Sequence, residues 1–423
     1  MPRYPGIYQC EKRVDRLIAA VYCCSKIDIV KQVVHSGRAH TRVSPASVTS
    51  ARILCLWTAA VFISASLPAS LQAAPHHYVA PATSSNLNLT TETVSDLSGG
   101  LTQGTVQDTL VDASFGLGTQ ELGLWYGGWF WVDLQHISSG DPSSTLVGDF
   151  QGVSNIAAPP GNRVYEFWFR QYLGHTNLKL RAGYIDLNNY FAQIPYADQV
   201  SNASLGLTPT ISGNAPTSTY SKPGAGMILS DGWANWQSQF GLFQGHPQER
   251  DQPFGHGYMA IGEIEYHAGS WSDSPQIFKL GAWQYSQPNP VRDGGPPSTW
   301  GTYAIWSQQL VPMFGSSRTH AFMQIGASPP QVSISPYYLG GGLALQGLVK
   351  NRPQDIFSIS VSRVWLRSAS GLRPETSYEV NYLWNFSSHL ALQPDLQYVT
   401  QPSGTSRPVP DAFVAILRLY IGL

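Results

Sequence analysis

The side chains best suited to binding chemistry share one face of a predicted hairpin at residues 163–186. Successive residues of a β-strand point to opposite faces, so reading each arm at a period of two assigns its side chains to faces. One face carries a carboxylate, a tryptophan and three cations: Glu166, Trp168, Arg170, Lys179 and Arg181. Charged groups form the stronger hydrogen bonds, and arginine presents several donors in a fixed fork. Together with an aromatic ring face, these groups could bind a solute rich in hydroxyl groups.

The opposite face of the same hairpin is apolar: Tyr165, Phe167, Phe169, Leu178, Leu180, Ala182 and Tyr184. A soluble β-sandwich buries its apolar face and rarely lines the other face with charges and aromatic rings. A β-barrel in a membrane does the reverse, with apolar side chains toward lipid and polar ones toward a wet lumen. The hairpin therefore predicts a membrane barrel, in which the same charged side chains could also simply brace and hydrate the lumen wall.

A second group of residues could bind a metal ion. Glu263, Glu265 and His267 alternate along the chain and would share a face of a strand. Two carboxylates and a histidine can hold a divalent cation. An ordinary lumen wall explains the same alternation, so we predict no metal and no cofactor.

Enzymatic and nucleic-acid-binding functions have weaker signals. Three carboxylates could supply the acid and base of a glycosidase: Asp133, Asp149 and Glu166. No spacing singles out a pair among them, and no metalloprotease, nucleophile-elbow or phosphate-binding motif occurs. Residues 74–423 carry 16 basic and 23 acidic side chains without a basic run. We therefore predict a protein that is not an enzyme and does not bind nucleic acid.

The composition favours a protein that meets lipid. The 423 residues have a formal net charge of −1 and only 12% charged residues, but 13 Trp and 21 Tyr. Tryptophan and tyrosine form belts at membrane interfaces. No segment after residue 73 has the run of about 18 apolar residues that a spanning helix needs. The chain is therefore expected to cross the membrane with strands.

The first 73 residues differ from the rest of the chain. They hold all four cysteines and carry nine basic against three acidic side chains. An apolar run at residues 53–67 is followed by a stretch of small residues, which predicts a secretory signal cleaved after Ala73. A short membrane anchor is the alternative interpretation. We expect residues 1–73 to be an N-terminal extension and signal peptide that is removed.

Regularly spaced alternating runs follow. Residues 74–98 are polar and predict a lead-in with only a weak first strand, whereas residues 99–423 accommodate about 16 strands at roughly 20 residues per strand and turn. Long gaps at 138–162 and 187–229 flank a short turn at 174–177. Outer-membrane barrels have this asymmetry between long outer loops and short periplasmic turns. The sequence leaves open whether the 187–229 segment folds inward or covers the mouth.

The C-terminal strands alternate most clearly. Their predicted lipid-facing residues include Tyr378, Val380, Trp384, Leu396 and Leu417. The opposite face extends the polar wall: Glu379, Asn381, Gln393, Asp395, Gln397 and Arg418. Polar residues toward the lumen are required by a barrel alone, so these residues could be structural or could contact solutes.

Ordered stretches across residues 99–423 resemble the carbohydrate-selective porin family, OprB type, of Gram-negative outer membranes. They include LGLWYGGWFWVDLQHISSGD, GDFQGVSNIAAPPGNRVYEFWFRQYL, NLKLRAGYIDLNNYFA, YYLGGGLALQGLVKNRPQDIFSISVS and the tail SYEVNYLWNFSSHLALQPDLQYVTQPSGT with PDAFVAILRLYIGL. Two features differ from the family pattern. The first strand is weak, and Leu423 stands where the family usually has Phe.

The resemblance implies an all-β, transmembrane, antiparallel up-and-down barrel of about 16 strands, located in the outer membrane and passing mono- and oligosaccharides passively into the periplasm. It also implies a pore narrowed by arginines and a glutamate, which we place at Glu166, Arg170 and Arg181, with Trp168 as a stacking surface. Expected partners are permeating sugars, outer-membrane lipid and lipopolysaccharide, and the barrel assembly machinery; a homotrimer is one consistent assembly. The alternatives are a general porin, a plugged structural or adhesion barrel, and a membrane-embedded hydrolase.

Overall fold

The computed structural model describes residues 83–215, 217–246, 253–268, 276–286, 298–310, 318–368 and 371–423. The expected signal sequence and its cleavage site therefore lie outside the described residues. Among those residues, no helix is long and apolar enough to cross a membrane.

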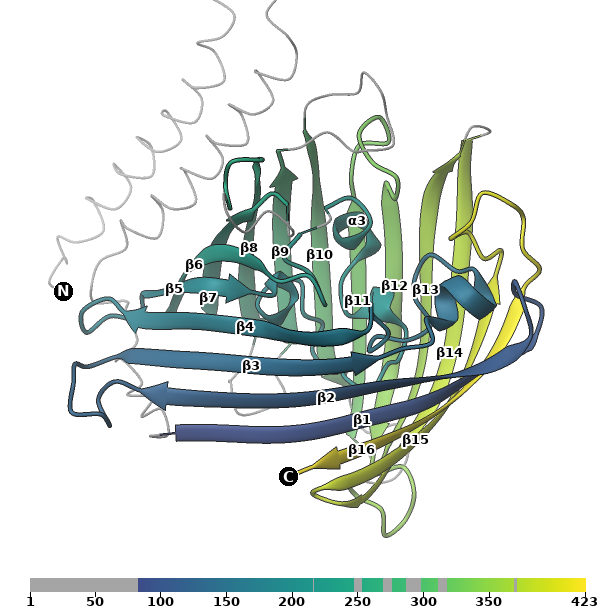
Figure 1. The fold of residues 1–423 in the computed structure, drawn as a ribbon, viewed down its shortest axis with the longest axis horizontal. Helices are drawn as coiled ribbons and strands as arrows, with labels where there is room; N and C mark the ends of the chain where they lie inside the picture. The colour runs from purple at the N-terminus through teal and green to yellow at the C-terminus, as the bar shows by residue number, and fades with distance from the viewer. Residues whose placement is uncertain are drawn as a thin grey trace, which may run out of the picture. The chain divides into compact units, whose positions relative to one another are not determined.

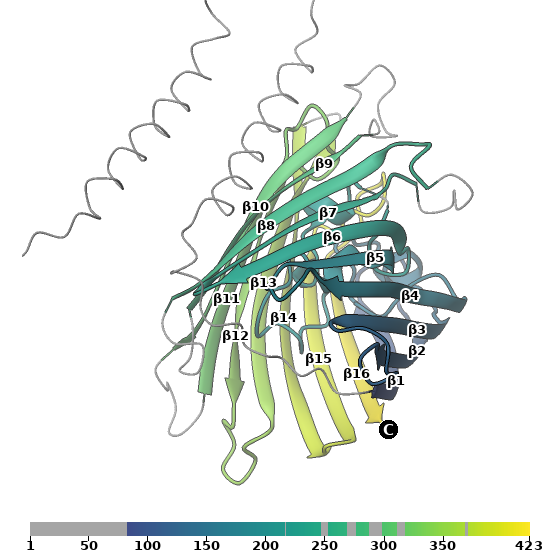
Figure 2. The ribbon, with the colours of Figure 1, turned by 90° about the vertical axis from the view of Figure 1, so that its left-hand side faces the viewer.

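Sixteen antiparallel strands in the described residues form one closed barrel, in which each strand pairs with its neighbours in the chain and β1 pairs with β16 (Figures 1 and 2). The strands are β1 Thr83–Ser98, β2 Gly104–Gly118, β3 Gly128–Ser138, β4 Gly161–Tyr172, β5 Lys179–Ile185, β6 Gly224–Trp233, β7 Trp236–Gln244, β8 Tyr258–Ala268, β9 Gln276–Tyr285, β10 Thr299–Leu310, β11 Arg318–Ala327, β12 Tyr337–Gln346, β13 Ile356–Ser368, β14 Gly371–Ser387, β15 Leu390–Thr400 and β16 Ala412–Gly422. The predicted fold class is confirmed.

Alternation along the C-terminal strands separates a lipid-facing surface from a polar interior. Leu396 and Leu417 are exposed on the outer face, whereas Gln393 and Gln397 are fully buried on the inner face. Apolar side chains are stable against lipid, and a closed ladder leaves no strand edge unpaired there. The two chemical faces of these strands are therefore those that the sequence predicts.

The first strand is longer than the sequence suggests. β1 spans 16 residues, pairs with both β2 and β16, and places the start of the barrel at Thr83 rather than at Gly99. Its outward positions include Thr91, Thr93 and Ser95 among leucines, and its inward Val94 is fully buried. This mixture of polar outward and apolar inward residues hides the alternation in the sequence.

The long segment between β5 and β6 folds into the barrel. It contains the short helices η3 Leu187–Asn189, η4 Ala203–Leu205 and α3 Pro209–Ser212. Phe191, Leu205 and Ile211 share a buried apolar cluster with inward residues of the wall, among them Tyr303 and Phe322. We call residues 186–223 the inner loop. The 187–229 segment therefore folds inward against the wall, which the sequence left open.

The wall makes room for the inner loop at small residues. A Cβ on Gly326 of β11 would lie 2.4 Å from Oγ1 of Thr210 and 2.7 Å from Oγ1 of Thr208. Such contacts are far shorter than van der Waals distances, so any larger residue would displace the loop. α3 consequently lies against β11 and β12 inside the barrel (Figure 1).

The segment between β3 and β4 also lines the interior and contacts the inner loop, since Oε1 of Gln151 accepts a hydrogen bond from Ser204 at 3.0 Å and the C=O of Gly152 accepts the N–H of Ala203 at 2.8 Å. It carries η2 Ser143–Val147, whose Leu146 and Val147 pack with Val94, Val414 and other inward apolar residues of β1, β15 and β16. The lumen is therefore narrowed by two loops that pack against the wall and are hydrogen-bonded to each other.

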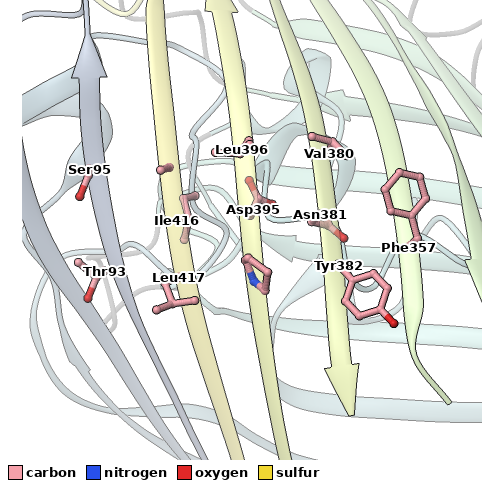
Figure 3. A pocket seen from close by; sticks show the side chains of 12 residues that line it. Thr93, Ser95, Phe357, Val380, Asn381, Tyr382, Asp395, Leu396, Ile416 and Leu417 are labelled. Atoms are coloured by element: carbon pink, nitrogen blue, oxygen red, sulfur yellow. The ribbon is translucent and has the colours of Figure 1, made fainter. Parts of the chain in front are cut away.

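An apolar groove of about 560 Å³ lies on the outer surface over β13 to β16 and β1 (Figure 3). Small residues such as Thr93, Ser95 and Ala415 form its floor, between Leu396 and Leu417. Pro394 of β15 also lines it and has no N–H, and the β14–β15 pairs skip from Asn381↔Asp395 to Trp384↔Leu392. The groove faces lipid and is separate from the lumen.

The seam between the first and last strands is held by a buried ion pair. Nε of Arg418 lies 2.6 Å from Oε2 of Glu92, the two residues are in register, and each is at most 2% exposed. Oε1 of Glu92 accepts a short hydrogen bond from Ser154, and Nη1 of Arg418 lies 3.3 Å from the hydroxyl of Tyr420. Arg418, predicted as a lumen-wall residue, thus closes the barrel.

Replacing Arg418 with Met should destabilise the barrel by about 3–5 kcal/mol, because Glu92 would remain as an uncompensated buried charge. We expect a lower midpoint for loss of the heat-modifiable form on gels, with partial recovery in the Glu92→Gln/Arg418→Met double variant. Arg363→Met, on the outward face of β13, serves as the control. Equal midpoints for the single variant and the unaltered protein would contradict a stabilising seam.

Candidate functional site

The inner wall of β3, β4 and β5 arranges the predicted hairpin residues in three tiers. The first is the in-register pair Asp133↔Glu166. The second places Trp131 and Trp168 side by side, with Gly183 beyond. The third consists of two in-register sets: Trp129↔Arg170↔Arg181 and Tyr172↔Lys179. We call these the carboxylate tier, the tryptophan tier and the cation tier.

The carboxylate tier is covered by the inner loop. Glu166 is 3% exposed. Its carboxylate accepts the backbone N–H of Asp186 at 3.0 Å, the indole N–H of Trp168 at 3.1 Å and the hydroxyl of Tyr190 at 3.4 Å. These contacts attach the start of the inner loop to the wall. Glu166 is therefore engaged by the protein itself.

A bulge in β4 changes the face of one hairpin residue. The β3–β4 register shifts between Asp133 and Leu134, so Tyr165 and Glu166 both point inward. Tyr165 is 5% exposed and its hydroxyl donates a short hydrogen bond to Asp186. The prediction that Tyr165 shares the outward apolar face with Phe167 is wrong, because strict alternation fails at a bulge.

The tryptophan tier presents one ring to the lumen more than the other. The rings of Trp131 and Trp168 lie 5.9 Å apart with an interplanar angle of 21°. A Cβ on Gly183 would lie 2.8 Å from Cβ of Trp168, so only glycine leaves room at this position. Trp168 is 7% exposed and also contacts the guanidinium of Arg181, at 4.4 Å. Trp131 is half-buried, which leaves more of its ring accessible than that of the predicted Trp168.

The cation tier contains three half-buried basic side chains, Arg170, Lys179 and Arg181. The guanidinium of Arg181 lies 3.9 Å from the ring centre of Tyr190, and that of Arg170 lies 5.1 Å from the ring centre of Tyr172. The ammonium of Lys179 lies 5.9 Å from the same Tyr172 ring. Within the described part of the chain, none of the three cations has a carboxylate oxygen within 4.0 Å.

A family model for the carbohydrate-selective porin, OprB family, matches residues 104–423. The chain belongs to the OprB family. A comparison with curated protein sequences found no match.

Solved structures support the fold of this OprB-family porin. The high-pH structure of Pseudomonas putida OprB superposes with a TM-score of 0.71 at 17% identity, covering 81% of this chain and 94% of that one. Salmonella typhi OmpF in complex with daunomycin gives a TM-score of 0.52 at 9% identity, covering 81% and 97%. The family assignment establishes an outer-membrane, carbohydrate-selective porin of a Gram-negative bacterium, as the sequence predicts.

The other predicted site residues of this porin lie outside the three tiers. Glu379 accepts the backbone N–H groups of Ser201 and Asn202 at 2.7 and 3.0 Å, and so holds the inner loop. Asp395 is 2% exposed on β15, and Arg418 belongs to the seam. Alternation correctly places these side chains inward but contains no information on what covers them.

The alternative metal site does not assemble around one point. Oε2 of Glu263 accepts the backbone N–H of Ala192 at 2.9 Å and the hydroxyl of Tyr303 at 2.8 Å. Glu265 instead lies 2.5 Å from Nε2 of His267 and 3.1 Å from Nζ of Lys279. Across the described ranges, no group of three or more His, Cys, Asp or Glu residues is placed to hold a metal ion.

Of the three carboxylates proposed for a glycosidase, Asp133 and Glu166 are in register on β3 and β4, whereas Asp149 has other partners. Asp149 lies in the β3–β4 segment, where its Oδ2 accepts the backbone N–H of Gly152 at 2.7 Å and burial raises its pKa to about 6. Glu166, by contrast, contacts the inner loop through Asp186. Asp149 thus accepts a hydrogen bond within the β3–β4 segment, whereas Glu166 accepts one from the inner loop.

Replacing Glu379 with Gln should loosen the inner loop, because the amide oxygen can replace only one carboxylate acceptor and its NH₂ opposes a backbone donor. We expect faster hydrogen exchange at the amides of Ser201 and Asn202, by a factor corresponding to about 1–3 kcal/mol. Glu121→Gln, at an exposed carboxylate in the β2–β3 turn, is the control. Unchanged exchange at both amides would rule out the anchoring role.

The base of the inner loop should become less stable as the pH rises. Burial raises the pKa of Asp186 to about 7 from 3.8, so the folded state holds its proton more tightly than the unfolded state. The resulting stabilisation is complete below about pH 4 and is lost as the pH rises toward 7. Hydrogen exchange at Asn188, corrected for intrinsic rates, should report this loss, and Asp186→Asn should remove it. A protection profile that rises over this range would refute the assignment.

Proposed function

We propose that sugars diffuse through this porin over the tryptophan and cation tiers of β3–β5, without any catalytic step. The observation that carries the proposal is the accessible edge of these tiers. Trp131, Arg170, Lys179 and Arg181 are each half-buried on the inner wall, beside an inner loop whose Tyr190 contacts Arg181. The loop therefore narrows the lumen next to the groups that can contact a solute.

The chemistry of these groups suits a hydroxyl-rich solute. Guanidinium groups donate several hydrogen bonds in a fixed fork, and an indole face packs against the C–H groups of a sugar ring. A channel must also release its solute, so each contact should be weak and the contacts should be spread along the path. Glu166 and Trp168 support the path, since their own contacts position the inner loop and Arg181.

Planar-bilayer recording tests the path. Titrating glucose or a short oligosaccharide into the chamber should reduce the ion current, and Trp131→Ala should weaken this block by roughly two- to tenfold, the size of one aromatic contact. Trp384→Ala, on the outward face of β14, is the matched control.

The same recordings distinguish the alternatives. Current that no sugar reduces would indicate a general porin. A heat-modifiable barrel that opens no channel would indicate a plugged structural protein, in which the two inward segments fill the lumen. Block that Trp131→Ala leaves unchanged would exclude the tryptophan tier from the path.

We also propose that the barrel is embedded in outer-membrane lipid and lipopolysaccharide, is inserted by the barrel assembly machinery, and forms homotrimers. The β2–β3 turn supports an additional apolar contact, because Leu122, Leu124 and Trp125 are 50%, 58% and 49% exposed. A second copy of the chain could cover them. Native mass spectrometry of the detergent-purified barrel would test this assembly, and a strictly monomeric species would contradict it.

A further inference from the structure

The cation tier carries three positive charges, and within the described part of the chain none of them has a carboxylate oxygen within 4.0 Å. Arg170 and Arg181 are directly opposite each other on β4 and β5, and Lys179 lies two residues from Arg181 on the same face. Like charges on directly opposed strand positions repel each other. The Nε atoms of both arginines are buried and have no hydrogen-bond partner among the described residues.

The nearest carboxylates are engaged elsewhere. Glu166 accepts hydrogen bonds from Trp168, Asp186 and Tyr190. Glu166 acts electrostatically on Arg181, and Asp231 of β6 acts on Lys179 from beyond 4.0 Å. Oδ1 of Asp231 accepts the N–H of Gly232 at 2.8 Å.

The inner loop does not supply a counter-charge to the tier either. Its carboxylates are Asp186, which is buried and bonded to Tyr165, and Asp198. No ion pair joins Asp198 to any of the three cations in the described residues. In the described residues, neither the wall nor the inner loop thus places a carboxylate oxygen within 4.0 Å of the three cations.

We propose that this site selects sugars that carry an anionic group, such as a hexuronic acid, over neutral sugars of the same size. The proposal rests on the proposed sugar path and names the solute that suits it best. The carboxylate or phosphate of the solute would lie against Arg170, Arg181 and Lys179, while its ring passes Trp131 in the adjacent tier. A neutral sugar would make the ring and hydroxyl contacts but would leave the repulsion among the cations unrelieved.

Separate titrations of three matched solutes test the proposal. Glucuronate, glucose and glucosamine differ mainly in charge, so each is titrated against the channel current at one ionic strength, and glucose 6-phosphate is added as a separate arm. We expect glucuronate to block at about tenfold lower concentration than glucose, and glucosamine to block least, because charge-assisted hydrogen bonds are the stronger kind. The phosphate arm distinguishes an anion site of general chemistry from one that suits a carboxylate.

Variants locate the effect. Arg170→Gln/Arg181→Gln should reduce the preference for glucuronate toward unity, and Lys179→Gln alone should reduce it partly. Arg363→Gln, an outward arginine of β13, removes a positive charge from the protein without touching the lumen and should leave the preference intact. Heat modifiability of each variant establishes that the barrel has folded.

The outcomes separate this proposal from the sugar path itself. Equal block by glucuronate and glucose would overturn the anionic preference and leave the sugar path standing. A channel that favours chloride but blocks equally with all three sugars would also overturn it. Block by no sugar would overturn both proposals. A preference that survives in Arg170→Gln/Arg181→Gln would show that the cation tier is not its source.

Discussion

The absence of water in the hydrocarbon core dictates this structure. Every backbone N–H and C=O group at that depth must be paired within the protein, which only helices and closed sheets achieve. The ladder from β1 to β16 meets this requirement by closing on itself. Pro394 of β15 cannot donate a backbone hydrogen bond to a neighbouring strand, and the outer surface forms a groove there. Closure also gives the barrel an inner face, and the polar side chains and the two inward loops lie on that side.

Acidic and basic side chains have different roles in this lumen. Carboxylates accept backbone N–H groups of the inward segments: Glu166 from Asp186, Glu263 from Ala192, Glu375 from Phe150, Gln151 and Ser403, and Glu379 from Ser201 and Asn202. A loop that enters a barrel loses the water that would bond its amides, and a carboxylate can accept several of them at once. These carboxylates thus hold the inward segments, and none of them forms an ion pair with the cations of β4 and β5 in the described residues.

The sequence predicts which face of a strand a side chain occupies better than it predicts what that side chain contacts. Alternation is reliable where outward residues are uniformly apolar, as at Val380 and Leu396, and it fails in β1, where threonine and serine occupy outward positions. It also fails at Tyr165, because a bulge depends on the neighbouring strand and leaves no local signature. The anchoring roles of Glu166 and Glu379 depend on where the inner loop folds, which no periodicity within a strand encodes. Trp131 could have been found, since it alternates with Asp133 in the strand paired with the hairpin.

The seam has a consequence for how the molecule assembles. Glu92 and Arg418 are separated by 326 positions in the chain, and their contact joins the first strand to the last. Contacts between distant parts of a chain form slowly, because the entropy of closing a long loop is lost before the contact stabilises anything. Until this contact forms, β1 and β16 are open edges that can pair with other chains and aggregate.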